Sequence, residues 1–300
     1  MLGSEGEPRK RRSGTRFEYE RAFSRTIGWI TAAEQTALRS KRIAIGGMGG
    51  VGGAHLLALA RLGIQRFTVA DGDVFELENF NRQLGASMRT IGRAKVEVMA
   101  ELVHDINPEA EVVALPGGID ADHVDRFLAG ADLFVDGLDL FALEARRLVF
   151  AACAVRGIPA ITAAPLGMGA ALLVFVPGGM TFERYFRLEG HDRVEQVLRF
   201  LVGLAPAALH RGYLVDRGTV DLAAGRASST PMGVHLAAGV AATAALKILL
   251  GRGSVLVAPH GIQLDAYENR VRRTWRPGGN ANPLQRFTIY MTRRFIGRSS

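Results

Sequence analysis

The stretch RIAIGGMGGVGGAHLLALARLG at residues 42–63, followed by RFTVAD at residues 66–71, decides the predicted fold. It contains a short apolar strand, a glycine-rich turn, a helix that Gly63 ends, and a second strand that ends at Asp71. This order is a β-turn-α-β unit with its glycines concentrated in the first turn. Strand and helix patterns continue to alternate as far as residue 164, which favours a parallel sheet with right-handed crossovers. We therefore predict an α/β fold with a Rossmann-like, doubly wound, mostly parallel sheet.

The regular alternation stops beyond Pro177, where an appended C-terminal half begins. The segment LGMGAALLVFVPGG, from Leu166, predicts one further strand that need not be parallel. The half beyond it is predicted to contain helices near 193–204 and 231–251 and a strand near 262–267. The division that we predict for the chain is a disordered basic tail at 1–16, a single domain at 17–269 with 177–269 as its appended half, and a basic C-terminal tail at 270–300.

The formal charge of +8 lies at the two ends of the chain. The first sixteen residues contain five basic residues against two glutamates, and the stretch from Arg270 to Arg298 contains eight arginines and no acid. The body between them is weakly acidic, so the overall charge says little about its function. Such ends are most simply solvated tails, but aromatic residues such as Trp275 and Tyr290 lie among the C-terminal arginines and could stack on bases. RNA binding by the C-terminal tail therefore stays open.

The single cysteine and the apolar segments exclude several classes of protein. Cys153 is the only cysteine, which excludes intramolecular disulfides and an all-cysteine zinc site and fits a reducing cytoplasm. The N-terminal basic run has no apolar region behind it, so no signal peptide is expected. The apolar stretch from His235 to Leu250 contains Lys247 and is too short for a convincing membrane span. We expect a cytoplasmic protein with no zinc and no membrane partner.

The glycine-rich turn predicts a nucleotide site. Four glycines spell GxGGxG directly after the first strand: Gly47, Gly49, Gly50 and Gly52. Glycines at such positions let the backbone approach a phosphate, and the N-terminus of the following helix favours negative charge. Asp71, about twenty residues further on, ends the second strand, where a carboxylate accepts hydrogen bonds from a ribose. The alternative is a glycine-rich turn that binds nothing.

NAD and ATP share this half of the site, and the segment after the second strand discriminates between them. It contains Asn79, Arg82 and Lys95, and two cations near a glycine-rich turn suit a triphosphate better than a pyrophosphate linked to nicotinamide. Asp136 and Asp139 follow in DLFVDGLDL, at the carboxyl end of a predicted strand, where ligands bind in open α/β sheets. A carboxylate there could hold Mg²⁺ that bridges phosphates. ATP and Mg²⁺ are the cofactors that we predict.

Taken together, the motifs of this chain resemble those of one family. The segments FSRTIG, IGGMGGVGG, VADGDVFELENFNRQ, GRAK, INPE and DLFVDGLD occur in the order and spacing of the E1-like activating enzymes, which include the ThiF, MoeB and HesA adenylyltransferases. The resemblance covers roughly residues 20–176, and GVAATAALKILLG at 239–251 is similar to the helix that closes the family's adenylation domain. It implies that residues 17–269 form one adenylation domain, with 177–269 on its substrate side.

The resemblance also implies roles for individual residues. The implied nucleotide contacts are Asp71 for the ribose, Asn79 beside the nucleotide, Arg82 and Lys95 for the phosphates, and Asp139 for Mg²⁺. Arg25, in FSRTIG, matches the arginine that homodimers of the family insert into the ATP site of the neighbouring subunit. The implied catalytic residues are Arg25, Arg82, Lys95 and Asp139.

The implied reaction is the ATP-dependent adenylation of a carboxylate with release of pyrophosphate. The implied substrate is the C-terminus of a ubiquitin-like or sulfur-carrier protein, or a small carboxylate. The tRNA threonylcarbamoyladenosine dehydratases carry a similar NRQ…AKxEVMAE…INPE stretch and are the alternative within the family. Two alternatives of other classes remain: an NAD(P)-dependent oxidoreductase, and a non-catalytic nucleotide-binding scaffold or RNA-binding module.

The sequence departs from the family at two places. Many relatives carry cysteine pairs that bind zinc in the later half, or a cysteine that forms a thioester, whereas Cys153 lies in an apolar helical segment and is expected to be a buried structural thiol. Leu140 replaces the asparagine that often follows the magnesium aspartate. His191 and His210 could act as acid–base groups, but scattered histidines are more often structural. We expect adenylation without a covalent thioester on this chain.

Overall fold

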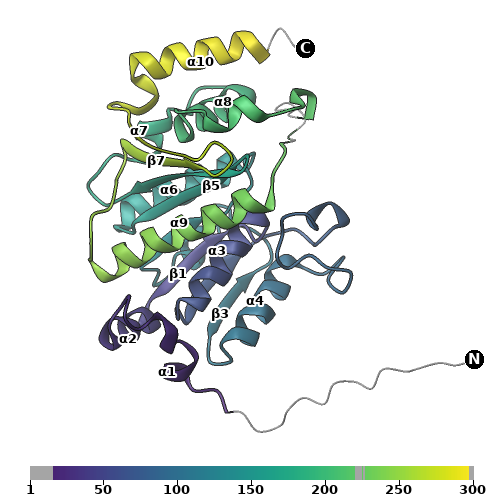
Figure 1. Ribbon diagram of the computed structural model, residues 1–300, viewed down its shortest axis with the longest axis vertical. Coiled ribbons are helices and arrows are strands. Elements are labelled where there is room, and N and C mark those ends of the chain that lie inside the picture. Colours follow the sequence, from purple (N-terminus) through teal and green to yellow (C-terminus); the bar gives the residue numbers. More distant parts are fainter. Residues whose placement is uncertain (1–15, 220–224, 226, 297–300) are drawn as a thin grey trace, which may run out of the picture.

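A single large sheet with helices on both faces forms the body of the protein (Figure 1). The computed structural model describes residues 16–219, 225 and 227–296. The predicted disordered tail therefore lies outside the described residues, except for Arg16 at its end.

The sheet has eight strands in the order β3-β2-β1-β4-β5-β6-β7-β8. The strands from β3 to β5 in this row pair in parallel, and β6, β7 and β8 are added antiparallel. The order reverses between β1 and β4, which is the point where doubly wound sheets bind nucleotides. The predicted doubly wound α/β fold is thus confirmed. The strands are β1 (Arg42–Gly46), β2 (Arg66–Ala70), β3 (Glu111–Leu115), β4 (Leu133–Asp136), β5 (Ala160–Leu166), β6 (Gly169–Phe175), β7 (His260–Asp265) and β8 (Arg270–Trp275).

Local sequence signals explain where several helices begin. The Thr31 hydroxyl accepts the Glu34 N–H at 3.1 Å and the Glu34 carboxylate accepts the Thr31 N–H at 2.7 Å, so Thr31 is the N-cap of the helix that begins at Ala32. The helix that contains Lys95 begins only at that residue, because Ile91 and Ala94 before it are held in isolated β-bridges. The α-helices are α1 (Tyr19–Ala22), α2 (Ala32–Ser40), α3 (Gly50–Arg61), α4 (Lys95–Ile106), α5 (Val124–Phe127), α6 (Leu143–Arg156), α7 (Phe182–Phe186), α8 (Arg193–Leu204), α9 (Pro231–Leu250) and α10 (Pro283–Ile296). Short 3₁₀ helices are η1 (Ser24–Thr26), η2 (Leu77–Asn79), η3 (Leu209–Tyr213), η4 (Arg217–Thr219) and η5 (Gly279–Ala281).

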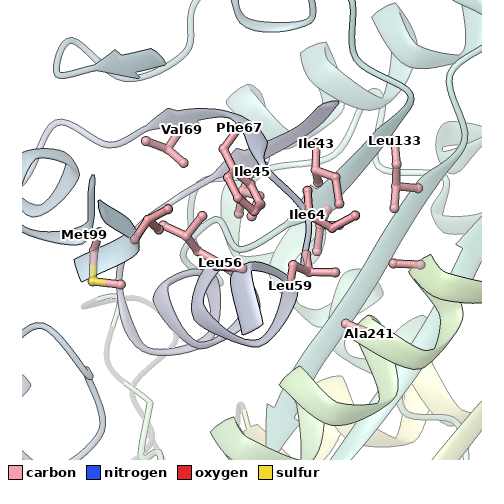
Figure 2. Close-up of a cluster of buried hydrophobic side chains, with 14 of the residues drawn as sticks. Ile43, Ile45, Leu56, Leu59, Ile64, Phe67, Val69, Met99, Leu133 and Ala241 are labelled. Atoms are coloured by element: carbon pink, nitrogen blue, oxygen red, sulfur yellow. The ribbon is translucent and has the colours of Figure 1, made fainter. Parts of the chain in front are cut away.

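Alternate side chains of each strand enter two separate cores, because successive residues of a strand point to opposite faces. Ile43 and Ile45 of β1 belong to the cluster under α3, α4 and α9, whereas Ala44 between them belongs to the cluster under α5, α6, α7 and α8. Figure 2 shows the first cluster, in which strand and helix side chains interdigitate: Ile43, Ile45, Phe67, Val69, Leu133, Leu56, Leu59, Ile64, Met99 and Ala241.

The long apolar helix α9 covers one face of the sheet. It crosses α3, β5 and β6, as Figure 1 shows, and its small residues Ala237, Ala241 and Ala245 are buried. By length and composition alone, it is the one helix among the described residues that could cross a membrane. Its buried residues pack on α3, β5 and β6 in this structure.

The C-terminal segment differs from the predicted basic tail. Residues 270–275 form β8, which pairs with β7 from His260↔Trp275 to Asp265↔Arg270, and residues 283–296 form α10, which packs on α8. The domain boundary expected after residue 269 is therefore wrong, because it falls inside a β-hairpin. Five of the six residues of β8 are exposed, among them Arg270, Arg272 and Arg273, and this is why the edge strand resembled a solvated tail in the sequence.

Candidate functional site

Two glycines of the GxGGxG turn are required by packing. Gly47 has a φ of +83°, and its N–H donates to the Ala70 carbonyl at 2.7 Å. A Cβ on Gly47 would lie 2.3 Å from the Gly137 carbonyl oxygen, and a Cβ on Gly52 would lie 1.8 Å from the Gly47 carbonyl oxygen. Both distances are far below contact, so only glycine allows β1, β4 and α3 to meet here.

The other two glycines have no such packing reason. A Cβ on Gly49 would lie 3.6 Å from Gln83 Nε2, and a Cβ on Gly50 would lie 3.4 Å from Arg82 Cγ, which are distances to flexible side chains. Gly50 begins α3, whose N-terminus favours a negative charge. Glycine at these two positions leaves the turn open, which would allow a phosphate to approach the backbone closely.

Asp71 follows β2 directly and points at the turn. Its Oδ2 accepts the Met48 N–H at 2.6 Å and its Oδ1 accepts the Asp73 N–H at 2.8 Å. Burial raises the pKa of the Asp71 carboxyl, and the two backbone hydrogen bonds oppose that rise. The carboxylate is thus held in one orientation beside the glycine turn, which suits the predicted contact with a ribose.

Lys95, the first residue of α4, makes an ion pair with a residue that the sequence analysis did not single out. Its Nζ donates to Asp73 Oδ2 at 2.9 Å; the lysine side chain is 7% exposed and that of Asp73 is 73% exposed. A buried ammonium needs an anion, and Asp73 provides it. The DGD triplet at 71–73 was the available signal for Asp73.

Arg82 and Asn79 lie in the loop between β2 and α4. Arg82 Nη1 donates to the Glu78 carbonyl at 2.9 Å and to Asn81 Oδ1 at 3.0 Å. Asn79 Oδ1 accepts the Glu76 N–H at 3.0 Å, so this amide caps η2 and shapes the loop. The structure therefore gives Asn79 a structural contact through its amide oxygen, and the amide nitrogen has no hydrogen-bond partner among the described residues.

Gln83 is a candidate nucleotide contact that the sequence analysis missed. It is buried beside Gly49, and its Oε1 has no hydrogen-bond partner within the described part of the chain. A buried polar atom without a partner is costly, so a ligand that satisfies it would be stabilised. The signal was present, because Gln83 is the last letter of the NRQ motif.

Two aspartates after β4 have different environments. Asp136 is buried, and its Oδ2 accepts Arg146 Nε at 2.8 Å. Arg146 Nη2 also donates to the Leu138 carbonyl at 2.6 Å and the Asp139 carbonyl at 3.1 Å, so it fixes the loop. Asp139 is exposed and uses one carboxylate oxygen, Oδ1, to accept the Phe141 N–H at 2.9 Å. Arg146, which the sequence analysis did not identify, therefore engages Asp136 and leaves Asp139 accessible.

Asp139 fits a Mg²⁺ ligand whose other partners come from a nucleotide. The described residues contain no group of three or more His, Cys, Asp or Glu side chains that could hold a metal by themselves. Mg²⁺ is commonly bound by one or two carboxylates together with substrate phosphates. One accessible carboxylate at the carboxyl edge of the sheet meets that requirement.

Arg25 does not join these residues within one chain. It lies in η1, where the neighbouring Thr26 donates to Gln35, and Gln35 donates to the Leu62 carbonyl at the C-terminal end of α3. The glycine turn is at the other end of α3, which is roughly 18 Å long at 1.5 Å for each of its 12 residues. Arg25 is exposed and lies near the end of α3 that is opposite the glycine turn.

The appended half contributes to the edge of the site. Asn81 Nδ2 donates to the Ser229 carbonyl at 3.3 Å, and Val234 of α9 lies 3.4 Å from the position of a Cβ on Gly50. His210 is half-buried, and its partial loss of solvent lowers its pKa; His191 lines a cavity elsewhere. Neither histidine is among the residues that surround the glycine turn.

Cys153 is a structural thiol, as expected. It is buried in α6, and this burial raises its pKa to about 12. A thiol that stays protonated at neutral pH is a poor nucleophile.

The chain belongs to the ThiF family, whose model matches residues 23–286. Among curated relatives, the tRNA threonylcarbamoyladenosine dehydratase of Bacillus subtilis is 36% identical over 150 residues, 50% of this chain and 57% of that protein. The Sulfur carrier protein ThiS adenylyltransferase of Escherichia coli is 32% identical over 143 residues, 48% of this chain and 56% of that protein. The chain thus spans about half the length of the curated relatives it matches.

Solved structures share the fold at low sequence identity. PaaA superposes with a TM-score of 0.65 at 20% identity, over 91% of this chain and 77% of PaaA. Escherichia coli MccB with MccA-N7isoASN gives a TM-score of 0.66 at 18% identity, over 90% of this chain and 75% of that chain. These likenesses confirm the Rossmann-like fold and its appended half.

Proposed function

We propose that this protein is an ATP-dependent adenylyltransferase that activates a carboxylate as an acyl adenylate and releases pyrophosphate. The observation that carries the proposal is the set of groups at one edge of the parallel sheet: an open glycine turn, the Asp71 carboxylate, the Lys95 ammonium and the accessible Asp139. Membership of the ThiF family supports it and argues against an NAD(P)-dependent oxidoreductase.

The proposed step is a displacement at the α-phosphorus of ATP. A carboxylate oxygen of the substrate forms a bond to that phosphorus, and the bond to the bridging oxygen breaks, so that pyrophosphate leaves with the electron pair. Such a step needs positioning and charge neutralisation more than a general base. Lys95 and Arg82 orient the phosphates, the turn donates backbone N–H groups, and Asp71 orients the ribose. Mg²⁺, which Asp139 would hold with phosphate oxygens, supplies further neutralisation when bound.

The substrate in this proposal is the C-terminus of a ubiquitin-like or sulfur-carrier protein, or a small carboxylate. Residues 177–269 would form the substrate side, because the segment before α9 borders the glycine turn. A dehydratase acting on tRNA is the second candidate, favoured by the 36% identity to the Bacillus subtilis enzyme and by the exposed arginines of β8. We expect either enzyme to work in the cytoplasm.

A homodimer would complete the site. Arg25 lies at the amino end of the sheet, and the nearby Ile27 and Trp29 are 46% and 85% exposed. Exposed apolar side chains of this size suit an interface between two copies. In such a dimer, Arg25 of one molecule would meet the phosphates bound by the other.

Ligand-induced thermal shifts test the nucleotide half of the proposal. A ligand at a hundred times its dissociation constant adds about 2.7 kcal/mol, which is roughly 5–10 °C for a domain of this size. Mg²⁺-ATP should give such a shift, and Asp139→Asn should remove the part that depends on Mg²⁺, while the control Asp105→Asn on the last turn of α4 keeps it. A shift with NAD or NADP in place of ATP would overturn the proposal.

Catalysis is tested by pyrophosphate release with candidate carboxylates, including carrier-protein C-termini. ATP binding without pyrophosphate release from any carboxylate would favour a non-catalytic scaffold. Mixing Arg25→Ala protein with Asp139→Asn protein should restore part of the activity, since one of the two sites in a mixed dimer is intact. Active Arg25→Ala protein by itself would refute the contribution in trans.

A further inference from the structure

A second cavity lies between α7, α8 and the start of α10. Its volume is ≈ 580 Å³, and its lining comes from α7 and the loop after it, from α8, from η5 and from α10. Figure 1 shows these helices at the end of the molecule opposite α1 and α4. The cavity is therefore separate from the glycine turn between β1 and α3.

Three arginines that line this cavity have no counter-charge. Arg184, Arg187 and Arg286 are exposed, and none makes a hydrogen bond or ion pair through its side chain within the described part of the chain. They come from three different places: the middle of α7, its C-cap and the first turn of α10. These three guanidinium groups line one cavity and are available to an anion, since no carboxylate of the described residues is paired with them.

The nearby acids are already paired. Glu183 accepts Arg147 Nε at 2.9 Å, and Glu195 accepts Arg199 Nε at 2.7 Å. Of the acids that line the cavity, only Glu189 has a carboxylate without a partner among the described residues. Three guanidinium groups against one carboxylate leave an excess of about two positive charges, which matches a dianion such as a phosphate monoester.

The backbone at Arg187 is strained for an arginine. Arg187 is the C-cap of α7, with a φ of 54° and a ψ of 59°, in the left-handed region. Glycine or asparagine occupies such positions with less strain. An arginine at this position therefore carries a small cost in backbone strain that glycine or asparagine would avoid.

The floor of the cavity is rigid. Asn280 is 1% exposed, and its Nδ2 donates to the Phe186 carbonyl at 2.7 Å and to the Arg199 carbonyl at 2.9 Å. These bonds tie η5 to α7 and α8, so the walls keep their spacing without a ligand. The volume of ≈ 580 Å³ lies in the range of sites for small organic molecules and exceeds what a bare phosphate needs.

We propose that this cavity binds a small organic molecule through a terminal, dianionic phosphate group. Guanidinium forks donate pairs of parallel hydrogen bonds to phosphate oxygens, and three of them can surround a tetrahedral dianion. A phosphodiester carries one negative charge and one fewer free oxygen, so the backbone of a nucleic acid fits this charge balance less well. The proposal does not depend on the proposed adenylation.

Calorimetric titration of the full chain with phenyl phosphate tests the proposal. Wild-type protein should bind phenyl phosphate, and Arg187→Asn should weaken binding at least tenfold, because asparagine keeps the left-handed backbone but removes the guanidinium. Arg286→Gln should do the same from a different helix. The control Arg272→Gln removes an exposed arginine from β8 and should leave the affinity unchanged. Thermal shifts with Mg²⁺-ATP should be the same in all variants.

Three results would overturn the proposal. The first is no binding by the wild type at millimolar phenyl phosphate. The second is equal affinity for diphenyl phosphate, which would show that the charge of a monoester is not recognised. The third is that Arg82→Gln loses affinity for phenyl phosphate while Arg187→Asn keeps it. Phenyl phosphate would then be bound at the nucleotide site. The melting temperature of Arg187→Asn should be at or above that of the wild type. Its loss of phenyl phosphate binding is then not caused by unfolding.

Discussion

Replacing Arg146 by methionine should destabilise the protein strongly, whereas the same change at its neighbour Arg147 should not. The side chains of the Arg146–Asp136 pair are 3% and 1% exposed, and those of the Arg147–Glu183 pair are 30% and 36% exposed. Removing one partner of a buried pair leaves an uncompensated charge and costs about 3–5 kcal/mol. A pair that is about one-third exposed contributes at most about 1 kcal/mol.

Thermal and urea unfolding of the two variants measure this difference. At roughly 2–4 °C per kcal/mol, Arg146→Met should lower the melting temperature by roughly 6–20 °C and Arg147→Met by less than about 4 °C. Adding Asp136→Leu to Arg146→Met should recover part of the loss, because the unpaired carboxylate is then removed. Arg146→Met should also lose the Mg²⁺-dependent part of ATP binding at temperatures where it is folded, since the guanidinium holds the backbone of Asp139.

Equal destabilisation by the two substitutions would refute this reasoning. It would mean that the buried ion pair contributes no more to the free energy of unfolding than the exposed one. It would also mean that contacts other than those of Arg146 hold the loop after β4. An unchanged nucleotide affinity in folded Arg146→Met would separately refute its role in positioning Asp139.

Three further predictions concern single positions. Gly52→Ala should unfold or severely destabilise the protein, because its Cβ would lie 1.8 Å from a backbone oxygen, and circular dichroism measures this loss. Gly49→Ala should keep the wild-type melting temperature and lose affinity for ATP in thermal-shift titrations. Burial lowers the pKa of His55 to about 4, so the unfolded state binds a proton more readily between about pH 6.5 and 4. The free energy of unfolding should therefore fall by about 3 kcal/mol as the pH falls through that range, and urea titrations of His55→Gln should show a flatter dependence. Cys153, whose pKa burial raises to about 12, should resist alkylation at pH 8 in native protein and react in urea; reaction of native protein at the rate of a free thiol would contradict its burial.

The sequence by itself determined the first half of the fold and the identity of the nucleotide turn. Both are encoded by residues that are neighbours in the chain. About twenty residues contain a strand, a turn and a helix, and only glycine at positions 47 and 52 allows that turn. This pattern predicts the same geometry in any context. The alternation of strands and helices then restricted the sheet to a parallel one with few possible connections. The family motifs follow from the same local geometry.

Only the tertiary structure decided which polar side chains of the candidate site remain available to contact a ligand. The strand pattern did not distinguish Asp136 from Asp139, and only the family resemblance selected Asp139. The burial of Asp136 against Arg146 of α6 is the physical difference between them. Lys95 looked like a free phosphate ligand, but it is held by Asp73. Such pairings depend on which helix packs beside which strand, and the free energy of each comes from burial that no local window contains.

The C-terminal part shows the same limit most clearly. Arg270–Trp275 is basic and irregular in hydrophobicity, and its strand exists because the edge of β7 offers unpaired N–H and C=O groups. The arginine-lined cavity joins Arg187 to Arg286, which are about a hundred residues apart in the chain. Whether separate charges form one site depends on the packing of α7, α8 and α10, and that packing is decided by apolar contacts between distant segments rather than by the charges themselves.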